Sequence, residues 1–173
     1  MINSIKNHKG FYIGRYETSG ISTTDVTKTP TIQKGGTVGG GNWYYHYQES
    51  KNIAKNSNVI SSMIWGCQWD RVMEWIVDTN RNALGEKDYS IVTDSSSWGN
   101  YNNYKTVTGD EKTSSGGNNP QPSGTNPAWQ KNHIYDLAGN VCEKTIEAMY
   151  NYIRVGRRRK LQWKRFNSFS ISP

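Results

Sequence analysis

Apolar side chains recur every three or four residues along one stretch of the chain, between Ser61 and Asn80. The repeating side chains are Trp65, Trp69, Val72, Met73 and Ile76. At 3.6 residues per turn this spacing gathers them on one face, so the stretch is predicted to form an amphipathic helix. We expect the helix to begin near Gly66, after a turn at Ser61 or Ser62.

Three shorter elements are predicted before this helix. Residues 11–18 are aromatic and β-branched and are bounded by glycine and serine, which is typical of a strand. Residues 19–41 are rich in Ser, Thr and Gly and are predicted to form a long loop, with one short edge strand near 29–33. Asn42 is expected to cap a helix over 43–55.

Residues 81–130 are predicted to be mostly loop, because Asn, Gly, Ser, Pro and Tyr dominate them. The aromatic and amide-rich run 98–104 lies within this region, and residues 114–127 are turn-forming. Tyr, Asn, Ser and Gly are the residues of adaptable recognition loops, where rings supply contact area and small polar groups supply hydrogen bonds. The same composition is typical of a solvated insertion with no partner, and both interpretations stay open.

The composition indicates one loop-rich domain of the α+β class. The chain has 173 residues, enough for a single core, and only 34% of them are hydrophobic, whereas seven Trp and eleven Tyr are present. A few large rings therefore supply much of the core, which suits an α+β domain better than a helical bundle.

The formal charge of +7 would ordinarily indicate an acidic partner, but its distribution is uneven. No Asp or Glu follows Glu147, and five basic residues gather near the C-terminus. These are Arg158, Arg159, Lys160, Lys164 and Arg165. The rest of the chain is nearly neutral, so the basicity belongs to the tail.

Membrane insertion is not predicted. No apolar run approaches the roughly 18 residues of a spanning helix. Residues 1–10 are polar and lack the apolar region of a signal peptide, so we expect synthesis in the cytoplasm.

The stretch 134–145 combines a short apolar start, an acidic turn and a Gly-Asn pair. Asp136 and Asn140 can cap nearby backbone groups, and Gly139 can take a positive φ without steric cost. Asp136 and Glu143, with the carbonyls between them, could hold a hard cation in a shell of oxygen ligands. By spacing alone, the same residues are also typical of a plain structured turn.

Residues 136–143, Asp-Leu-Ala-Gly-Asn-Val-Cys-Glu, resemble the D-M-A-G-N-V-W-E-W-T signature of the formylglycine-generating enzyme (sulfatase-modifying factor) family. Other landmarks of the family follow in its order: the opening strand at 10–17, the Trp-rich helix at 69–75, the W-G-N turn at 98–100, and Arg154-Val155. The resemblance covers residues 10–157. It implies a C-type-lectin-like fold, with two helices packed on a twisted, mainly antiparallel sheet.

The resemblance also implies a structural Ca²⁺ site that pins a loop. Its donors would be the side chains of Asp136 and Glu143 and the backbone carbonyls of Gly139 and Val141. Cys142 and Lys144 stand where the family usually has Trp, which would loosen the local packing.

Catalysis is not expected from these residues. Copper-dependent members of the family carry a pair of cysteines beyond Arg154-Val155, whereas this chain has no cysteine after Cys142, and Cys67 lies on another landmark. The three histidines are too scattered to indicate an iron-binding triad. We therefore predict a non-catalytic binding module, as in phage-tail or surface-displayed relatives. Such a module would be associated with a virion or a cell surface. The alternative is a metal-dependent oxidase of the same family.

A ligand or protein partner is expected to contact the aromatic and amide side chains of the loop. These are Trp98, Asn100, Tyr101, Asn103 and Tyr104.

The basic tail, residues 158–173, leaves three interpretations. Clustered cations with Trp163 and Phe166 could bind nucleic acid, or the tract could be a targeting signal.

The third interpretation is a one-nucleotide frameshift after Arg157. Suitable codons for 158–166, read one nucleotide along, encode Gly-Gly-Asn-Tyr-Asn-Gly-Ser-Gly. This sequence restores the glycine-rich strand of the family. The predicted domain is then 1–157, incomplete at its C-terminus. Codons that cannot encode Gly-Gly-Asn in the shifted frame would exclude this hypothesis.

Overall fold

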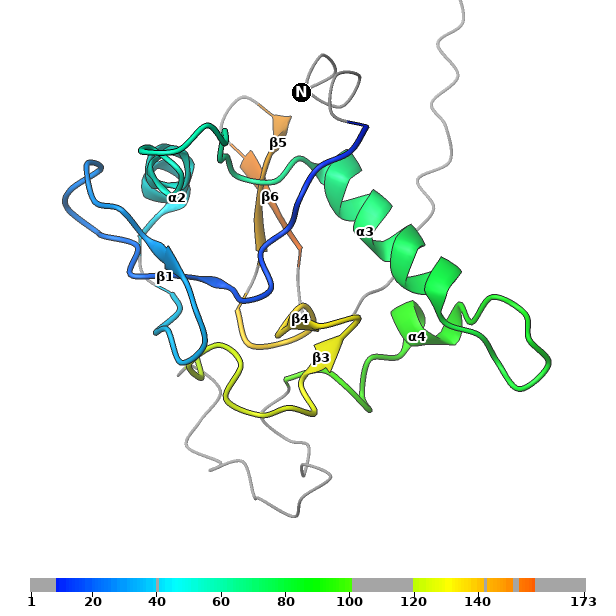
Figure 1. The fold of residues 1–173 in the computed structure, drawn as a ribbon. Helices are drawn as coiled ribbons and strands as arrows, with labels where there is room; N and C mark the ends of the chain where they lie inside the picture. The colour runs from blue at the N-terminus through cyan, green and yellow to red at the C-terminus, as the bar shows by residue number, and fades with distance from the viewer. Residues whose placement is uncertain (1–8, 40, 101–119, 142, 151–152, 158–173) are drawn as a thin grey trace, which may run out of the picture.

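The computed structural model of the chain describes residues 9–39, 41–100, 120–141, 143–150 and 153–157 (Figure 1). Within them, α-helices and short antiparallel strands alternate with long loops. The elements in chain order are β1 (Thr18–Ser19), β2 (Thr31–Ile32), α2 (Trp43–Glu49), the 3₁₀ helix η1 (Ser50–Asn52), α3 (Gly66–Thr79), α4 (Ser90–Thr93), β3 (Gln130–Lys131), β4 (Ile134–Tyr135), β5 (Glu143–Tyr150) and β6 (Ile153–Arg157). The predicted α+β class is confirmed.

The strands of the described residues pair as three separate antiparallel hairpins, β1 with β2, β3 with β4, and β5 with β6. The β5–β6 hairpin lies between α2 on one side and α3 on the other (Figure 1), and β5 contacts both helices. The finer C-type-lectin-like arrangement stays a prediction.

Helix α3 begins at Gly66, as the apolar spacing predicts. The side-chain oxygen of Gln68 accepts a hydrogen bond from the Trp65 backbone N–H at 2.9 Å, which satisfies one donor at the helix start. A side chain at position 66 would overlap the carboxylate of Glu147, so glycine lets this strand residue approach the helix closely. At the other end the Asn80 side-chain amide donates to the Ile76 carbonyl at 2.7 Å.

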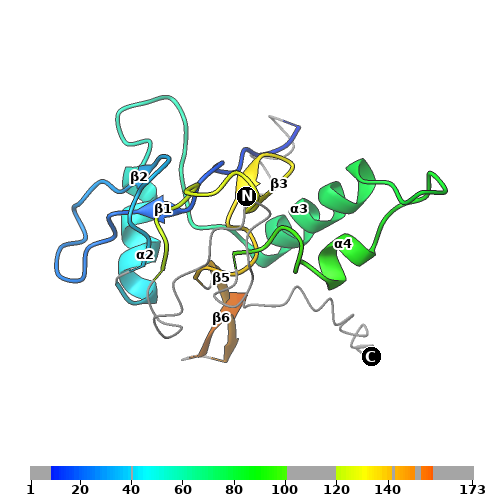
Figure 2. The ribbon, with the colours of Figure 1, turned by 90° about the horizontal axis from the view of Figure 1, so that it is seen from below.

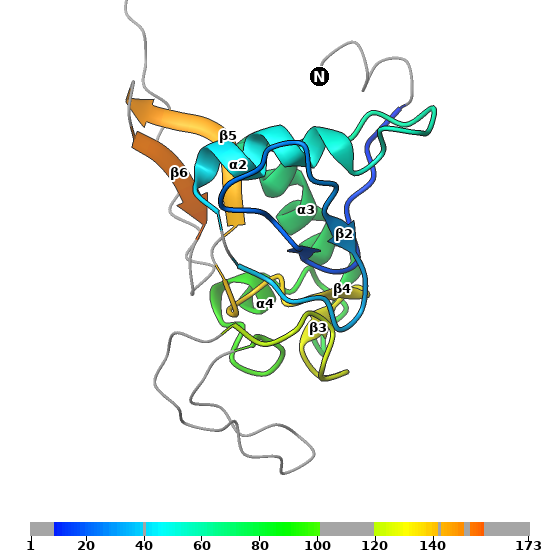
Figure 3. The same cartoon turned by 90° about the vertical axis from the view of Figure 1, so that its left-hand side faces the viewer.

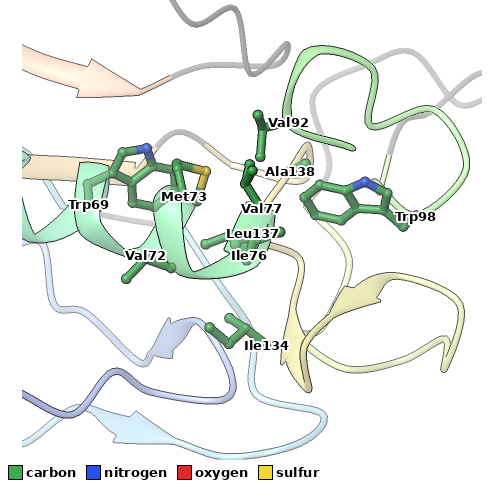
Figure 4. Close-up of a cluster of buried hydrophobic side chains, with 10 residues drawn as sticks. All are labelled: Trp69, Val72, Met73, Ile76, Val77, Val92, Trp98, Ile134, Leu137 and Ala138. Carbon is green, nitrogen blue, oxygen red and sulfur yellow. The ribbon is translucent and has the colours of Figure 1, made fainter. Parts of the chain in front are cut away.

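The apolar face of α3 forms the main core with α4 and the segment around β4 (Figure 4). The cluster consists of Trp69, Val72, Met73, Ile76, Val77, Val92, Trp98, Ile134, Leu137 and Ala138. Because the helix supplies half of these side chains, the prediction of a buried, amphipathic helix is confirmed.

Helix α2 is shorter than the predicted 43–55. Asn42 caps it as expected, since its Oδ1 accepts from the backbone N–H of Tyr44 at 2.9 Å. The regular helix ends at Glu49, and one 3₁₀ turn follows. The fully buried Glu49 carboxylate accepts from the Ser22 N–H at 3.0 Å, which ties the 19–41 loop to the end of the helix.

The strand predicted over residues 11–18 was wrong for most of its length, because only Thr18 and its neighbour Ser19 pair as β1. The preceding residues follow other contacts: Phe11 packs against the core cluster, and the Tyr16 ring stacks on the Tyr135 ring at 5.1 Å between centroids. The edge strand expected near 29–33 is present as β2.

Among the described residues, no helix is both long enough and apolar enough to cross a membrane.

Replacing Ile76 tests the core. Ile76 is fully buried, so Ile76→Ala is expected to lower the free energy of unfolding by about 2–5 kcal/mol through lost apolar burial and a residual cavity. Ile60, which is 93% exposed, supplies the matched control. Ile60→Ala should change the free energy of unfolding by less than about 0.5 kcal/mol. Urea denaturation measures both. Equal effects would contradict the assigned core.

Candidate functional site

The turn after β4 places one polar side chain inside the protein, that of Asp136, and holds a second, that of Asn140, half-buried beside it. Asp136 and Asn140 both have left-handed backbone conformations, with φ of 57° and 50°, and Gly139 between them has φ of 89°. Gly139 pairs with Asn100 as an isolated parallel bridge, and a Cβ at position 139 would overlap the Asn100 backbone carbonyl. This close approach, in addition to the positive φ, requires glycine.

The carboxylate of Asp136 is buried and receives hydrogen bonds from two distant segments. Its Oδ1 accepts from the Asn100 side-chain amide at 2.9 Å, and its Oδ2 accepts from the Gly124 N–H at 2.8 Å and the Ser123 hydroxyl at 3.2 Å. Asp136 is 1% exposed, so these donors replace the water that the ionised group loses on folding. The sequence predicts a local cap here, whereas the contacts are long-range.

Asn140 connects the two chain segments that flank residues 101–119. Its backbone N–H donates to the Asn100 carbonyl at 2.8 Å. Its side chain pairs with Gln121 twice, accepting from the Gln121 N–H at 2.8 Å and donating to the Gln121 carbonyl at 3.0 Å. One asparagine therefore holds both ends of the Tyr- and Asn-rich segment.

Glu17 is the acidic member of this network that the sequence did not indicate. Its Oε2 accepts from the Asn140 side-chain amide at 2.6 Å, and its backbone N–H donates to the Ser123 hydroxyl at 3.0 Å. Its Oε1 is buried without a hydrogen-bond partner among the described residues. The available signal was that Glu17 is the single acidic residue of the aromatic segment 11–18.

Burial raises the pKa of Glu17 from 4.5 to about 8, and the neighbouring charge of Asp136 adds to the increase. Hydrogen bonds from Asn140 and the Val141 backbone act in the opposite direction. The carboxyl of Glu17 is therefore largely protonated at neutral pH, which removes the repulsion between two acids in one buried network.

The four residues predicted to bind Ca²⁺ all belong to the turn or to the start of β5. Both oxygens of Asp136 accept hydrogen bonds, so a cation ligated by Asp136 would share this carboxylate with the donors of residues 100, 123 and 124. Glu143 is the first residue of β5, opposite Arg157. The searched part of the chain, which is limited to the described residues, contains no group of three or more His, Cys, Asp or Glu that could hold a metal ion. The oxygen-only site, which also uses the Gly139 and Val141 carbonyls, stays a prediction.

Two of the five predicted ligand-binding residues are buried. Trp98 is 6% exposed, and its indole N–H donates to the Ile91 carbonyl at 3.1 Å, while Asn100 is 2% exposed. The Trp98 side chain lies in the core and the Asn100 side chain in the polar network, and binding through them stays a prediction. Tyr101, Asn103 and Tyr104 lie outside the described residues, so binding through them stays a prediction.

Cys67 is exposed in the first turn of α3. Cys142 lies outside the described residues, and so do His8 and the basic tail 158–173, so their predicted roles are untested.

In comparisons of this chain with protein-family models, curated proteins and solved structures, none matches. The resemblance to the formylglycine-generating enzyme family therefore rests on the motifs of the sequence.

Replacing Gly139 separates crowding from backbone strain. Gly139→Ala is expected to lower the free energy of unfolding by more than about 2 kcal/mol, because the added methyl group overlaps the Asn100 backbone. Gly85 also has a positive φ, of 79°, yet has open space around it, so Gly85→Ala should cost about 1 kcal/mol from the φ alone. Thermal and urea unfolding measure the difference. Equal losses would contradict the close approach.

Replacing Glu17 tests the shared burial of two acids. Between pH 4.5 and about 8 the folded state holds a proton at Glu17 that the unfolded chain has lost, so stability falls as pH rises through this window. The slope reaches at most about 1.4 kcal/mol per pH unit. A glutamine side chain at position 17 does not titrate. The free energy of unfolding of Glu17→Gln should therefore decline less between about pH 5 and about pH 8 than that of the unaltered protein. Parallel curves for the two proteins would show that Glu17 does not titrate in this way.

Proposed function

We propose that this protein is a non-catalytic binding module, similar to the formylglycine-generating enzyme family, which presents residues 101–119 to a ligand or protein. The observation that carries the proposal is the attachment of both ends of this segment to Asn140. The residues that flank the segment are thus fixed by half-buried hydrogen bonds, while the sequence of the segment supplies the contact chemistry.

The composition of residues 101–119 suits such a role, since Tyr, Asn, Ser, Thr and Gly account for most of them. Fixing the two ends before binding lowers the conformational entropy that association would otherwise cost. Binding and catalytic residues commonly lie on segments that a rigid scaffold positions in this way. A Ca²⁺ ion at the 136–143 turn would add rigidity to the same base.

Two tyrosines in the segment provide the test. The full chain is applied to a glycan array and an array of extended peptides, and the best probe is then titrated with purified protein. The double variant Tyr101→Ala/Tyr104→Ala should weaken binding at least about tenfold, because aromatic anchors dominate recognition surfaces. The matched control is Tyr44→Ala/Tyr89→Ala, two tyrosines that are 52% and 58% exposed elsewhere, and its affinity should be unchanged.

Three outcomes would overturn the proposal. Oxygen consumption by the full chain with added copper or iron and a cysteine-containing peptide would favour the oxidase. Binding of an oligonucleotide that falls steeply with salt and is lost on truncation after Arg157 would favour the basic tail instead. Equal loss of probe binding in both tyrosine variants would also contradict a specific surface at 101–119.

A further inference from the structure

The chain between η1 and α3 contains a closed loop, residues 54–61. Its two ends are joined, because the Ala54 N–H donates to the Ser61 hydroxyl oxygen at 3.1 Å. Within the loop, the Ser57 N–H donates to the Ala54 carbonyl at 3.0 Å, and the Ser57 hydroxyl oxygen accepts from the Val59 N–H at 3.2 Å. These local hydrogen bonds give the loop a defined shape. In Figures 2 and 3 the chain between α2 and α3, which contains the loop, stands out from the described body.

Two apolar pairs lie in and after this loop, separated by two serines, and they differ in burial. Met63 is 7% exposed, and Ile64 packs against the core cluster. Val59 and Ile60 are instead 63% and 93% exposed. Single exposed aliphatic side chains are common on proteins, but two neighbours on a protruding, hydrogen-bonded loop form an apolar tip. Such a tip is typical of a site that contacts a partner or a lipid.

The charges next to the tip are positive along its own segment. Residues 50–69 contain no Asp or Glu, whereas Lys51 and Lys55 are both exposed. The Lys51 ammonium lies over the Tyr47 ring at 3.7 Å from its centroid, and Lys55 belongs to the loop itself. The apolar tip therefore rises from a basic base.

A second loop adds to this base through Asn52. The Asn52 side-chain amide donates to the Val26 carbonyl at 3.0 Å and to the Lys28 carbonyl at 2.9 Å. This neighbouring loop brings one exposed lysine, Lys28, and one acid, Asp25, which accepts from the Thr27 hydroxyl at 2.6 Å. Across the two adjacent segments 22–28 and 50–61, three lysines accompany a single acid.

An anionic lipid bilayer matches both features of the loop. Aliphatic side chains gain free energy at the boundary between headgroups and acyl chains, and lysines beside them are attracted to lipid phosphates. Lysine also reaches the headgroups while its methylene stem lies along apolar surface. Because the loop satisfies several of its own backbone N–H groups, contact with a bilayer does not leave those donors without an acceptor.

We propose that the 54–61 loop is a membrane-docking site, in which Val59 and Ile60 insert into the surface of an anionic bilayer and the surrounding lysines contact phosphate groups. Two side chains support peripheral, reversible association rather than permanent anchoring. The loop lies at the opposite end of the described body from the β3–β4 hairpin (Figures 1 and 3). Docking here is therefore independent of the proposed binding through residues 101–119.

The test uses the full chain and vesicles of phosphatidylcholine with and without phosphatidylglycerol. Co-sedimentation is expected to show binding to the anionic vesicles that weakens with salt. Val59→Ser/Ile60→Ser should weaken this binding at least about tenfold, because two aliphatic side chains lose their transfer into lipid. Leu84→Ser is the matched control, since Leu84 is 82% exposed on another loop, and its binding should be unchanged.

A position-specific signal separates the loop from the basic tail, which charge alone could bring to the same vesicles. Ile60→Trp should gain emission that brominated lipids quench, whereas Leu84→Trp should not. Both positions are exposed, so neither substitution should change the free energy of unfolding.

Three results would overturn the proposal. The first is full-chain binding to anionic vesicles that is absent, or that the double serine variant retains in full. The second is equal quenching of Ile60→Trp and Leu84→Trp, which would assign the attraction to charge elsewhere. The third is a dimer in sedimentation without lipid that only the double serine variant loses, which would assign the tip to a second copy of the chain.

Discussion

The burial of the Asp136 carboxylate is the interaction on which the rest of this structure depends. An ionised group that is 1% exposed is tolerated only when donors replace its water, and three donors from residues 100, 123 and 124 do so. These donors come from chain segments that share no other regular element. The hydrogen bonds to one carboxylate therefore join the turn after β4 to two segments that are distant from each other in the sequence.

The same short turn also serves the apolar core. Ile134, Leu137 and Ala138 pack with the buried face of α3, whereas Asp136 and Asn140 enter the polar network. Core packing is tolerant of shape and is not directional, but hydrogen bonds fix distances and angles. The turn thus couples the position of the helix to the geometry of the loops, and the protonated state of Glu17 keeps this coupling free of repulsion between acids.

The sequence predicted what depends on local periodicity. Helix α3 and its start at Gly66 follow from the spacing of apolar residues, and the cap at Asn42 follows from its side chain. The prediction of a strand over 11–18 was wrong for most of its length. Strand formation requires a paired strand, whereas Tyr16 stacks on the Tyr135 ring and the Arg15 carbonyl accepts a single hydrogen bond from the Tyr135 N–H. Glu17 was missed, and the burial of Trp98 and Asn100 was not foreseen, for a related reason: burial is a property of the assembled loops, which no short window of sequence contains.

The double attachment at Asn140 has a consequence for how this chain can change. Because Asn140 holds both Asn100 and Gln121, any chain that joins these two residues must close over the same fixed separation. Doubling the length of such a loop costs only about 0.6 kcal/mol of closure entropy. Insertions and deletions between Asn100 and Gln121 should therefore cost the fold little free energy, because the core and the polar network lie outside that stretch.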